Sequence, residues 1–122
     1  MTKEQLKNRT KQFVLDVFKF LMRLNKTKAV DVVSYQLFKS SSSVAANYRA
    51  VCRGKSTADF LNKLKVVDEE ADESLFWLEF IKGLEIECDK IELEKLIKEA
   101  DELVAIFSAG IRTIKEKNNI KN

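Results

Sequence analysis

The stretch QLFKSSSSVAANYRAVCRG, residues 36–54, contains four consecutive serines, which by themselves are typical of a flexible linker between domains. Small and hydrophobic residues nevertheless recur every three or four positions through the serines, from Val30 to Val51. A flexible linker has no reason to keep the helical phase on both sides of itself. The sequence therefore predicts one uninterrupted helix over about residues 29–53, with small side chains where another helix can approach closely.

Three other segments show the same periodicity, and each begins near a residue that favours a helix N-cap. The predicted N-caps are Thr2, Thr27, Ser56 and Asp89. Glycine is common just after a helix, so Gly54 and Gly83 are predicted to end the second and third helices. The predicted helices cover about residues 3–24, 29–53, 57–83 and 90–115, and the tail 116–122 is expected to fray.

The composition agrees with a helical protein. Proline is absent, glycine occurs three times and 34% of the residues are charged, which favours long helices over strands joined by tight turns. With 45% hydrophobic residues, the 122 residues can form one core. We expect a single all-α domain over residues 1–122, folded as an antiparallel up-down-up-down four-helix bundle.

The sequence offers little for membrane insertion or for chemistry. It contains no apolar run long enough to span a bilayer and no signal-peptide pattern, so a cytoplasmic location is expected. Cys52 and Cys88 lack metal-binding or redox spacing, and we expect both to be reduced and partly buried. Histidine is absent, and no catalytic triad or phosphate-binding loop is present, so we expect no enzyme and no cofactor.

Carboxylates cluster in the third helix, where they could in principle hold two metal ions inside a bundle. The cluster comprises Asp68, Glu69, Glu70, Asp72, Glu73 and Glu79. Di-metal bundles use a Glu-x-x-His motif, which a chain without histidine cannot supply. The favoured interpretation is an acidic strip that faces solvent or an interface, with no metal.

Charge is distributed unevenly along the chain. Residues 1–66 carry 14 Lys and Arg against 4 Asp and Glu, net +10, whereas residues 67–122 carry 8 against 15, net −7. Three interpretations remain open: a solvated face, a surface for a polyanion, and pairing of the basic half with the acidic half of another subunit. For the second, the candidate phosphate contacts are Lys7, Lys11, Arg49, Arg53 and Lys55.

A ladder of small polar residues follows one side of the second predicted helix. Its members are Gln36, Ser40, Ser43 and Asn47, spaced by four, three and four positions. Such a ladder lets another backbone come close, so packing against a neighbouring helix is favoured over a ligand site. Phe76, Trp77 and Phe80 exceed what one bundle core needs, as do Leu15, Phe18 and Met22, and these residues are candidates for an interface.

The ladder also carries a family resemblance. Ser40-x-x-Ser43-Val44-Ala45-Ala46-Asn47 after Gln36-Leu37, then Asp59-Phe60, Glu69–Ser74 and Trp77-Leu78, resembles the proteins encoded in intervening sequences of 23S ribosomal RNA genes. The resemblance covers about half of the chain. It implies a bacterial four-helix bundle that assembles into a homo-oligomeric, pentameric ring. It also implies kinship with basic accessory proteins of diversity-generating retroelements, which bind nucleic acid and a reverse transcriptase.

Two hypotheses about function follow. The first is a non-enzymatic homo-oligomer that binds RNA or DNA through the basic surface of the first two helices. The second is a scaffold or accessory subunit that binds another protein through the region of Trp77 and Phe80, without nucleic acid. Neither hypothesis involves a membrane.

Overall fold

The computed structural model describes residues 1–119, and within this range it contains four α-helices and no strand. They are α1 (Lys3–Met22), α2 (Lys28–Val51), α3 (Thr57–Leu84) and α4 (Lys90–Lys117). The predicted all-α class is therefore confirmed, and each helix boundary lies within two residues of its predicted position. In particular, the four serines lie inside α2, so residues 36–54 do not form a linker.

Each helix begins with the N-cap that the sequence predicts. The Thr2 hydroxyl accepts a hydrogen bond from the Gln5 amide, and the Gln5 side chain accepts one from the Thr2 amide, which forms a complete capping box. The side chains of Thr27, Ser56 and Asp89 likewise accept hydrogen bonds from the amide three residues later. These bonds satisfy backbone donors that the first helical turn leaves without a partner.

All four helix ends differ from the prediction by one or two residues, and α1 and α2 end early, at Met22 and Val51. Gly54 and Gly83 do not adopt the left-handed conformation, and α3 runs through Gly83 to Leu84. The left-handed residue that ends α3 is instead Glu85, with φ of 54°. Helix α4 continues through Lys117, so residues 116 and 117 are helical rather than frayed. Residues 120–122, the remainder of the predicted frayed tail, lie outside the described residues.

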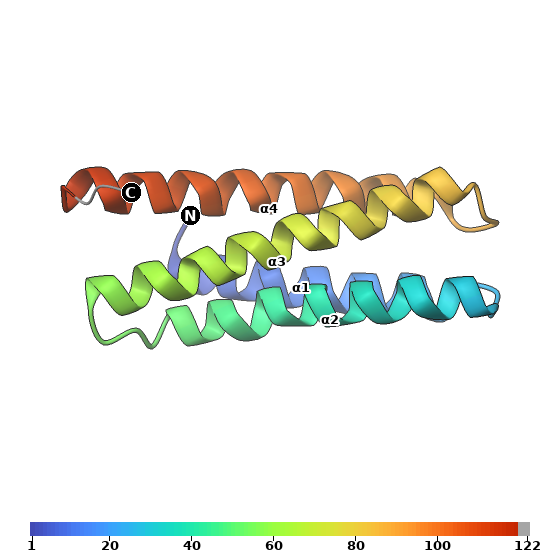
Figure 1. Ribbon diagram of the computed structural model, residues 1–122, viewed down its shortest axis with the longest axis horizontal. Helices are drawn as coiled ribbons and strands as arrows, with labels where there is room; N and C mark the ends of the chain where they lie inside the picture. Colours follow the sequence, from blue (N-terminus) through green and yellow to red (C-terminus); the bar gives the residue numbers. More distant parts are fainter. Residues whose placement is uncertain (120–122) are drawn as a thin grey trace.

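The helices run alternately in opposite directions (Figure 1). The α2–α3 turn and the end of α4 therefore lie at one end of the bundle, which we call the terminal end, and the α1–α2 and α3–α4 turns lie at the other. Helix α3 slants across the bundle, from beside α2 at its start toward α4 at its end. Neighbours in sequence make the extensive contacts, and the contact between α1 and α4 is the thinnest of the four.

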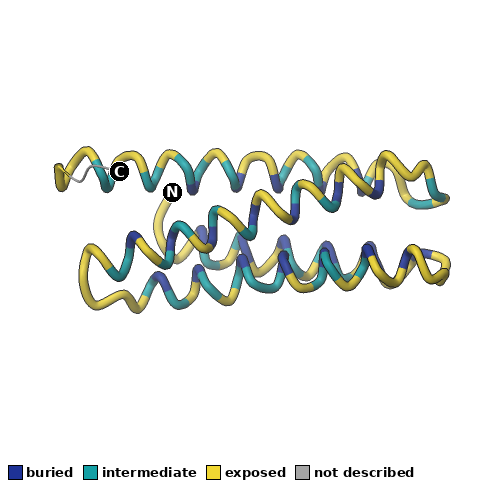
Figure 2. The backbone as a smooth tube through the Cα atoms, in the orientation of Figure 1, coloured by how far each residue is buried: buried dark blue, intermediate teal, exposed yellow. Residues whose placement is uncertain are grey.

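One continuous core fills the space between the helices, and the buried positions of each helix turn toward it (Figure 2). All the core residues expected in α1 and α2 are buried, from Leu6 to Leu24 and from Val30 to Val51. In α3 the helical spacing over residues 60–80 predicts a core stripe that ends at Phe80, and this is partly wrong, because Phe80 is 41% exposed whereas Ile81, next to it, is 1% exposed. Leu61 and Ser74 are further core positions of α3 that the sequence interpretation did not include.

Candidate nucleic-acid interface and neighbouring surfaces

The outer side of the α1–α2 pair gathers four of the five candidate phosphate contacts. The ring centres of Phe18 and Phe38 lie 4.3 Å apart, and this contact fixes the register of the two antiparallel helices. Lys7 lies as many residues before Phe18 as Arg49 lies after Phe38, so the two are level on the antiparallel helices. Lys11 lies one turn nearer the α1–α2 turn. Arg53 follows Arg49 by four residues, in the turn just past the end of α2. We call the surface formed by Lys7, Lys11, Arg49 and Arg53 the basic face.

Most of the basic face is open to solvent. Lys11, Arg49 and Arg53 are exposed, whereas Lys7 is half-buried and its Nζ lies 3.7 Å from a carboxylate oxygen of Glu4. This ion pair is within one exposed helical turn, so it is weak and leaves the lysine able to exchange partners. The basic face can therefore present several mobile cations to an extended anion.

Lys55, the fifth candidate, lies in the turn between α2 and α3 at the terminal end. It borders a shallow pocket of about 430 Å³ that also includes Lys3 and Lys117. The Lys3 ammonium sits 4.8 Å from the centre of the Phe60 ring. The Lys55 amide donates a hydrogen bond to Asp59, and this bond, after the stronger one from Lys63, lowers the pKa of the Asp59 carboxyl. The pocket thus extends positive charge beyond the basic face.

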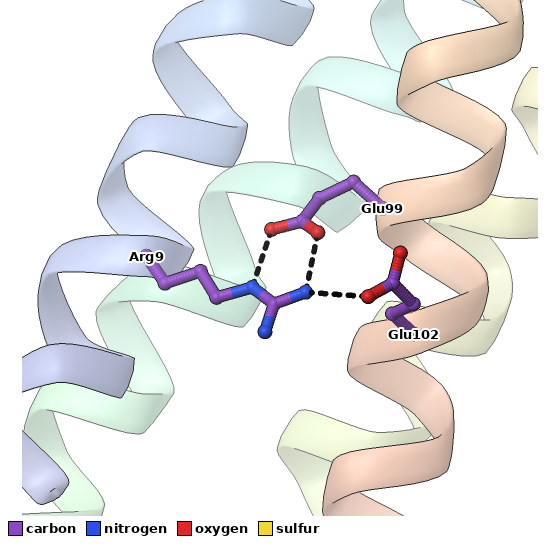
Figure 3. Close-up of polar contacts among 3 residues, drawn as sticks. All are labelled: Arg9, Glu99 and Glu102. Atoms are coloured by element: carbon purple, nitrogen blue, oxygen red, sulfur yellow. Dashed lines mark hydrogen bonds and ion pairs between the residues drawn. The ribbon is translucent and has the colours of Figure 1, made fainter. Parts of the chain in front are cut away.

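Arg9 does not contribute to the basic face, because it turns to the opposite side of α1 and bridges to α4 (Figure 3). Its Nε and Nη2 donate to the two carboxylate oxygens of Glu99 at 2.7 and 2.6 Å, and Nη2 also contacts Glu102 at 3.2 Å. The hydrogen bonds that Arg9 donates to Glu99, more than the charge of Glu99, raise the pKa of the Arg9 guanidinium. This bidentate pair borders a groove of about 750 Å³ along the thin α1–α4 contact.

The polar ladder of α2 lies partly between helices. Ser40 is fully buried, and its hydroxyl oxygen is 3.0 Å from that of Ser74 on α3, which is also fully buried. The Glu70 carbonyl oxygen, at 2.8 Å, is a second acceptor within reach of the single Ser74 hydroxyl proton. Because both side chains are small, this pair lets the α2 and α3 backbones approach closely. Ser40 therefore packs against another helix of the same chain.

The rest of the ladder is less enclosed. Ser43 and Asn47 are half-buried, and the Asn47 amide donates to the Ser43 carbonyl at 2.8 Å and to its hydroxyl at 2.7 Å, both within α2. Gln36 is half-buried one turn before Ser40. The structure thus places Ser40 in a helix contact, and gives Ser43 and Asn47 partners on their own helix.

Three of the aromatic residues of α3, near its C-terminal end, form a cluster on its outer side. The centre of the Trp77 ring lies 4.9 Å from the centre of the Phe76 ring and 5.5 Å from that of Phe80. Phe76 is 53% exposed, and Trp77 is half-buried against the core. The indole Nε1 of Trp77 is buried without a hydrogen-bond partner among the described residues. We call Phe76, Trp77 and Phe80 the aromatic face.

The carboxylates of α3 do not converge. Asp68 is half-buried toward α4, where the Ser108 hydroxyl donates to it at 3.1 Å, whereas Glu69, Asp72, Glu73 and Glu79 are exposed. Burial raises the pKa of the Asp68 carboxyl, against the effect of the Ser108 hydrogen bond. Within residues 1–119 no three Asp, Glu, Cys or His side chains come together as a metal site would require.

Two further observations concern expectations from the sequence. Cys52 and Cys88 are unpaired and half-buried, as predicted. No helix in the described part of the chain combines the length and the apolar character that a membrane span needs.

Comparisons with known proteins agree with the fold and the motif. A family model described as "23S rRNA-intervening sequence protein" matches residues 2–109. A crystal structure of a protein of unknown function from the S23 ribosomal protein family of Bacteroides thetaiotaomicron VPI-5482 superposes with a TM-score of 0.81 at 26% sequence identity. The match covers 92% of this chain and 99% of that one. No curated protein matches this chain. Neither description of a matching family or structure mentions catalysis.

Proposed function

The chain belongs to the 23S rRNA-intervening sequence protein family, and from this premise we propose a non-enzymatic protein that self-associates and binds RNA or DNA through its basic face. The observation that carries the proposal is the gathering of Lys7, Lys11, Arg49 and Arg53 on one side of the α1–α2 pair. Cations on one face can follow a phosphate backbone together, whereas scattered cations cannot.

The mechanism is neutralisation of phosphates with release of condensed counterions. Arg49 and Arg53 present two guanidinium groups from positions four residues apart, and each can donate to phosphate oxygens in a bidentate manner. Contacts of this kind fix the position of a nucleic acid without reading its bases, so we expect little sequence specificity. Lys3, Lys55 and Lys117 extend the positive surface around the terminal end.

Self-association is the second part of the proposal, and five copies is the number that the family resemblance implies. Exposed aromatic surface supports it, because Phe76 and Phe80 leave about half of their side chains uncovered in a single chain. The same observation favours the alternative function, a scaffold that binds another protein through the aromatic face and binds no nucleic acid.

The salt dependence of binding to single-stranded RNA tests the function. If the five candidate cations each neutralise one phosphate, the affinity should fall about a hundredfold between roughly 50 and 200 mM salt. The double variant Arg49→Ala, Arg53→Ala loses two contacts, and the fall should shrink to about twentyfold. Lys98→Ala removes one exposed cation from α4 and serves as the control, with an unchanged salt slope.

Binding that is immeasurable at low salt, or indifferent to salt, would reject the nucleic-acid proposal. If a protein from nuclease-treated lysate is then retained by the wild type but not by a Phe76→Ser, Phe80→Ser variant, the scaffold function replaces it.

A further inference from the structure

The outer side of the α1–α2 pair changes character along its length. The basic face occupies the terminal end, and toward the α1–α2 turn the surface becomes apolar. Met22 is 77% exposed and Tyr35 is 62% exposed, next to the half-buried Phe38. These three side chains border a hollow of about 330 Å³ between the two helices, which we call the apolar hollow. A single chain leaves it uncovered.

Cations outnumber carboxylates around the apolar hollow. Lys26 lines it directly, and so does one exposed carboxylate, Asp31. Lys19 lies three residues before Met22 on α1, and Lys39 lies four residues after Tyr35 on α2, so each is one turn away on the exposed side of its helix. The surface is therefore an apolar centre with a basic rim.

The aromatic face has the same design with the opposite charge. Phe76 and Phe80 project from successive turns of α3, with ring centres 6.1 Å apart. Glu73 and Glu79 are exposed and lie three residues on either side of Phe76. This surface is an aromatic ridge with an acidic rim. It lies on α3, whereas the apolar hollow lies between α1 and α2, so one chain cannot bring the two together.

We propose that the aromatic ridge of one copy seats Phe76 and Phe80 in the apolar hollow of a second copy, with the acidic rim opposite the basic rim. This inference rests on the self-association of the proposed function and specifies its contact. Both halves of a matched pair occur on the same chain, and opposite charges around each apolar centre exclude pairing of like surfaces. The contact is head-to-tail: each copy offers one ridge and one hollow, and no two-fold axis relates them.

A stable contact has to cover only a modest share of one chain's surface. An ordinary protein interface removes about 800 Å² from each partner, which is about a tenth of the 7837 Å² that one chain exposes. Aromatic side chains that enter a preformed hollow are the residues that dominate the binding energy of such interfaces. Phe76 and Phe80 should therefore be indispensable, and residues outside the two surfaces should not.

Mixing two defective variants tests the head-to-tail contact. The ridge variant is Phe76→Ser, Phe80→Ser, and the hollow variant is Met22→Asp, Tyr35→Asp. All four positions are exposed, so both variants should fold, which far-ultraviolet circular dichroism checks. By light scattering at micromolar concentration we expect the wild type to be an oligomer and each variant to be a monomer. An equimolar mixture should contain a dimer and nothing larger, because one intact ridge meets one intact hollow.

Three results would overturn the inference: a monomeric wild type, a variant that still assembles alone, or a mixture that stays monomeric. Ile91→Asp is the control, because Ile91 is 74% exposed on α4, outside both surfaces, and its oligomer should be unchanged. The salt slope of RNA binding is measured on the same variants. If the wild type does not bind RNA but the mixed ridge and hollow variants still form a dimer, the nucleic-acid function is rejected and the contact between copies stands.

Discussion

Replacing Arg9 by methionine should lower the free energy of unfolding by about 2 kcal/mol. Methionine keeps the unbranched apolar stem of the side chain but leaves Glu99 without its two hydrogen bonds, of 2.7 and 2.6 Å. Both side chains of the pair are only about a quarter exposed, at 25% and 27%. Exposed ion pairs contribute roughly 0–1 kcal/mol and breaking a buried one costs about 3–5 kcal/mol, so a half-buried bidentate pair falls between these limits.

A double-mutant cycle separates the pair from its surroundings. With an m-value of about 1.5 kcal/mol/M, Arg9→Met should move the midpoint of urea unfolding down by about 1.3 M at fixed protein concentration. Glu99→Gln alone should cost about 1.5 kcal/mol, and the double variant should be little worse than Arg9→Met. The coupling energy between Arg9 and Glu99 is expected to be about 1.5 kcal/mol.

The matched control is an ion pair between α3 and α4, Lys82 with Glu94, whose N–O distance is a comparable 2.8 Å. Its side chains are 59% and 55% exposed, so its coupling energy should stay below about 0.5 kcal/mol. Equal coupling in the two cycles, or less than about 0.3 kcal/mol between Arg9 and Glu99, would refute the argument that partial burial gives the Arg9 pair its strength.

Three further predictions concern stability. Burial raises the pKa of Asp68, so the charge of its carboxylate opposes folding at pH values above its pKa in the unfolded chain. Asp68→Asn should therefore stabilise the protein at pH 7 but not at pH 3, which urea unfolding at the two pH values measures. Glu85→Gly should raise the unfolding free energy by about 1 kcal/mol, because the left-handed backbone at φ of 54° favours glycine; an unchanged midpoint would contradict this. Ser40→Leu should cost about 3 kcal/mol at the close contact with Ser74, whereas Ala46→Leu at an exposed position of the same helix should cost less than about 0.5 kcal/mol in thermal unfolding.

Local signals were enough to predict most of the fold. N-capping depends on a residue and the amide three positions later, so Thr2, Thr27, Ser56 and Asp89 could be identified from short segments. The serine run could be placed in α2 because the apolar phase on either side of it is strict. Helix ends were harder to predict, since Glu85 adopts a conformation that its side chain disfavours and that only the α3–α4 turn requires.

Helix α3 marks the limit of periodicity as a guide. Between Leu75 and Ile81 nearly every side chain is apolar, so several faces satisfy the helical pattern equally well. The choice of Ile81 over Phe80 for the core depends on how α3 slants across the bundle, and no local pattern contains that angle. Ser74 escaped notice for a related reason, because a serine becomes a core residue only when another small residue faces it.

The same reasoning applies to charge. Helical spacing already puts Arg9 on a different side of the first helix from Lys7 and Lys11, but it does not say what either side meets. The fold separates them: α4 supplies Glu99 and Glu102 on one side of α1, and α2 supplies Arg49 on the other. Arg9 is thereby committed to holding the thin α1–α4 contact, whereas Lys7 has only its weak ion pair with Glu4. A count of basic residues therefore overstates the number of cations available to a phosphate backbone, because it includes cations such as Arg9 that are paired within the fold. The basic face consists of cations that remain available.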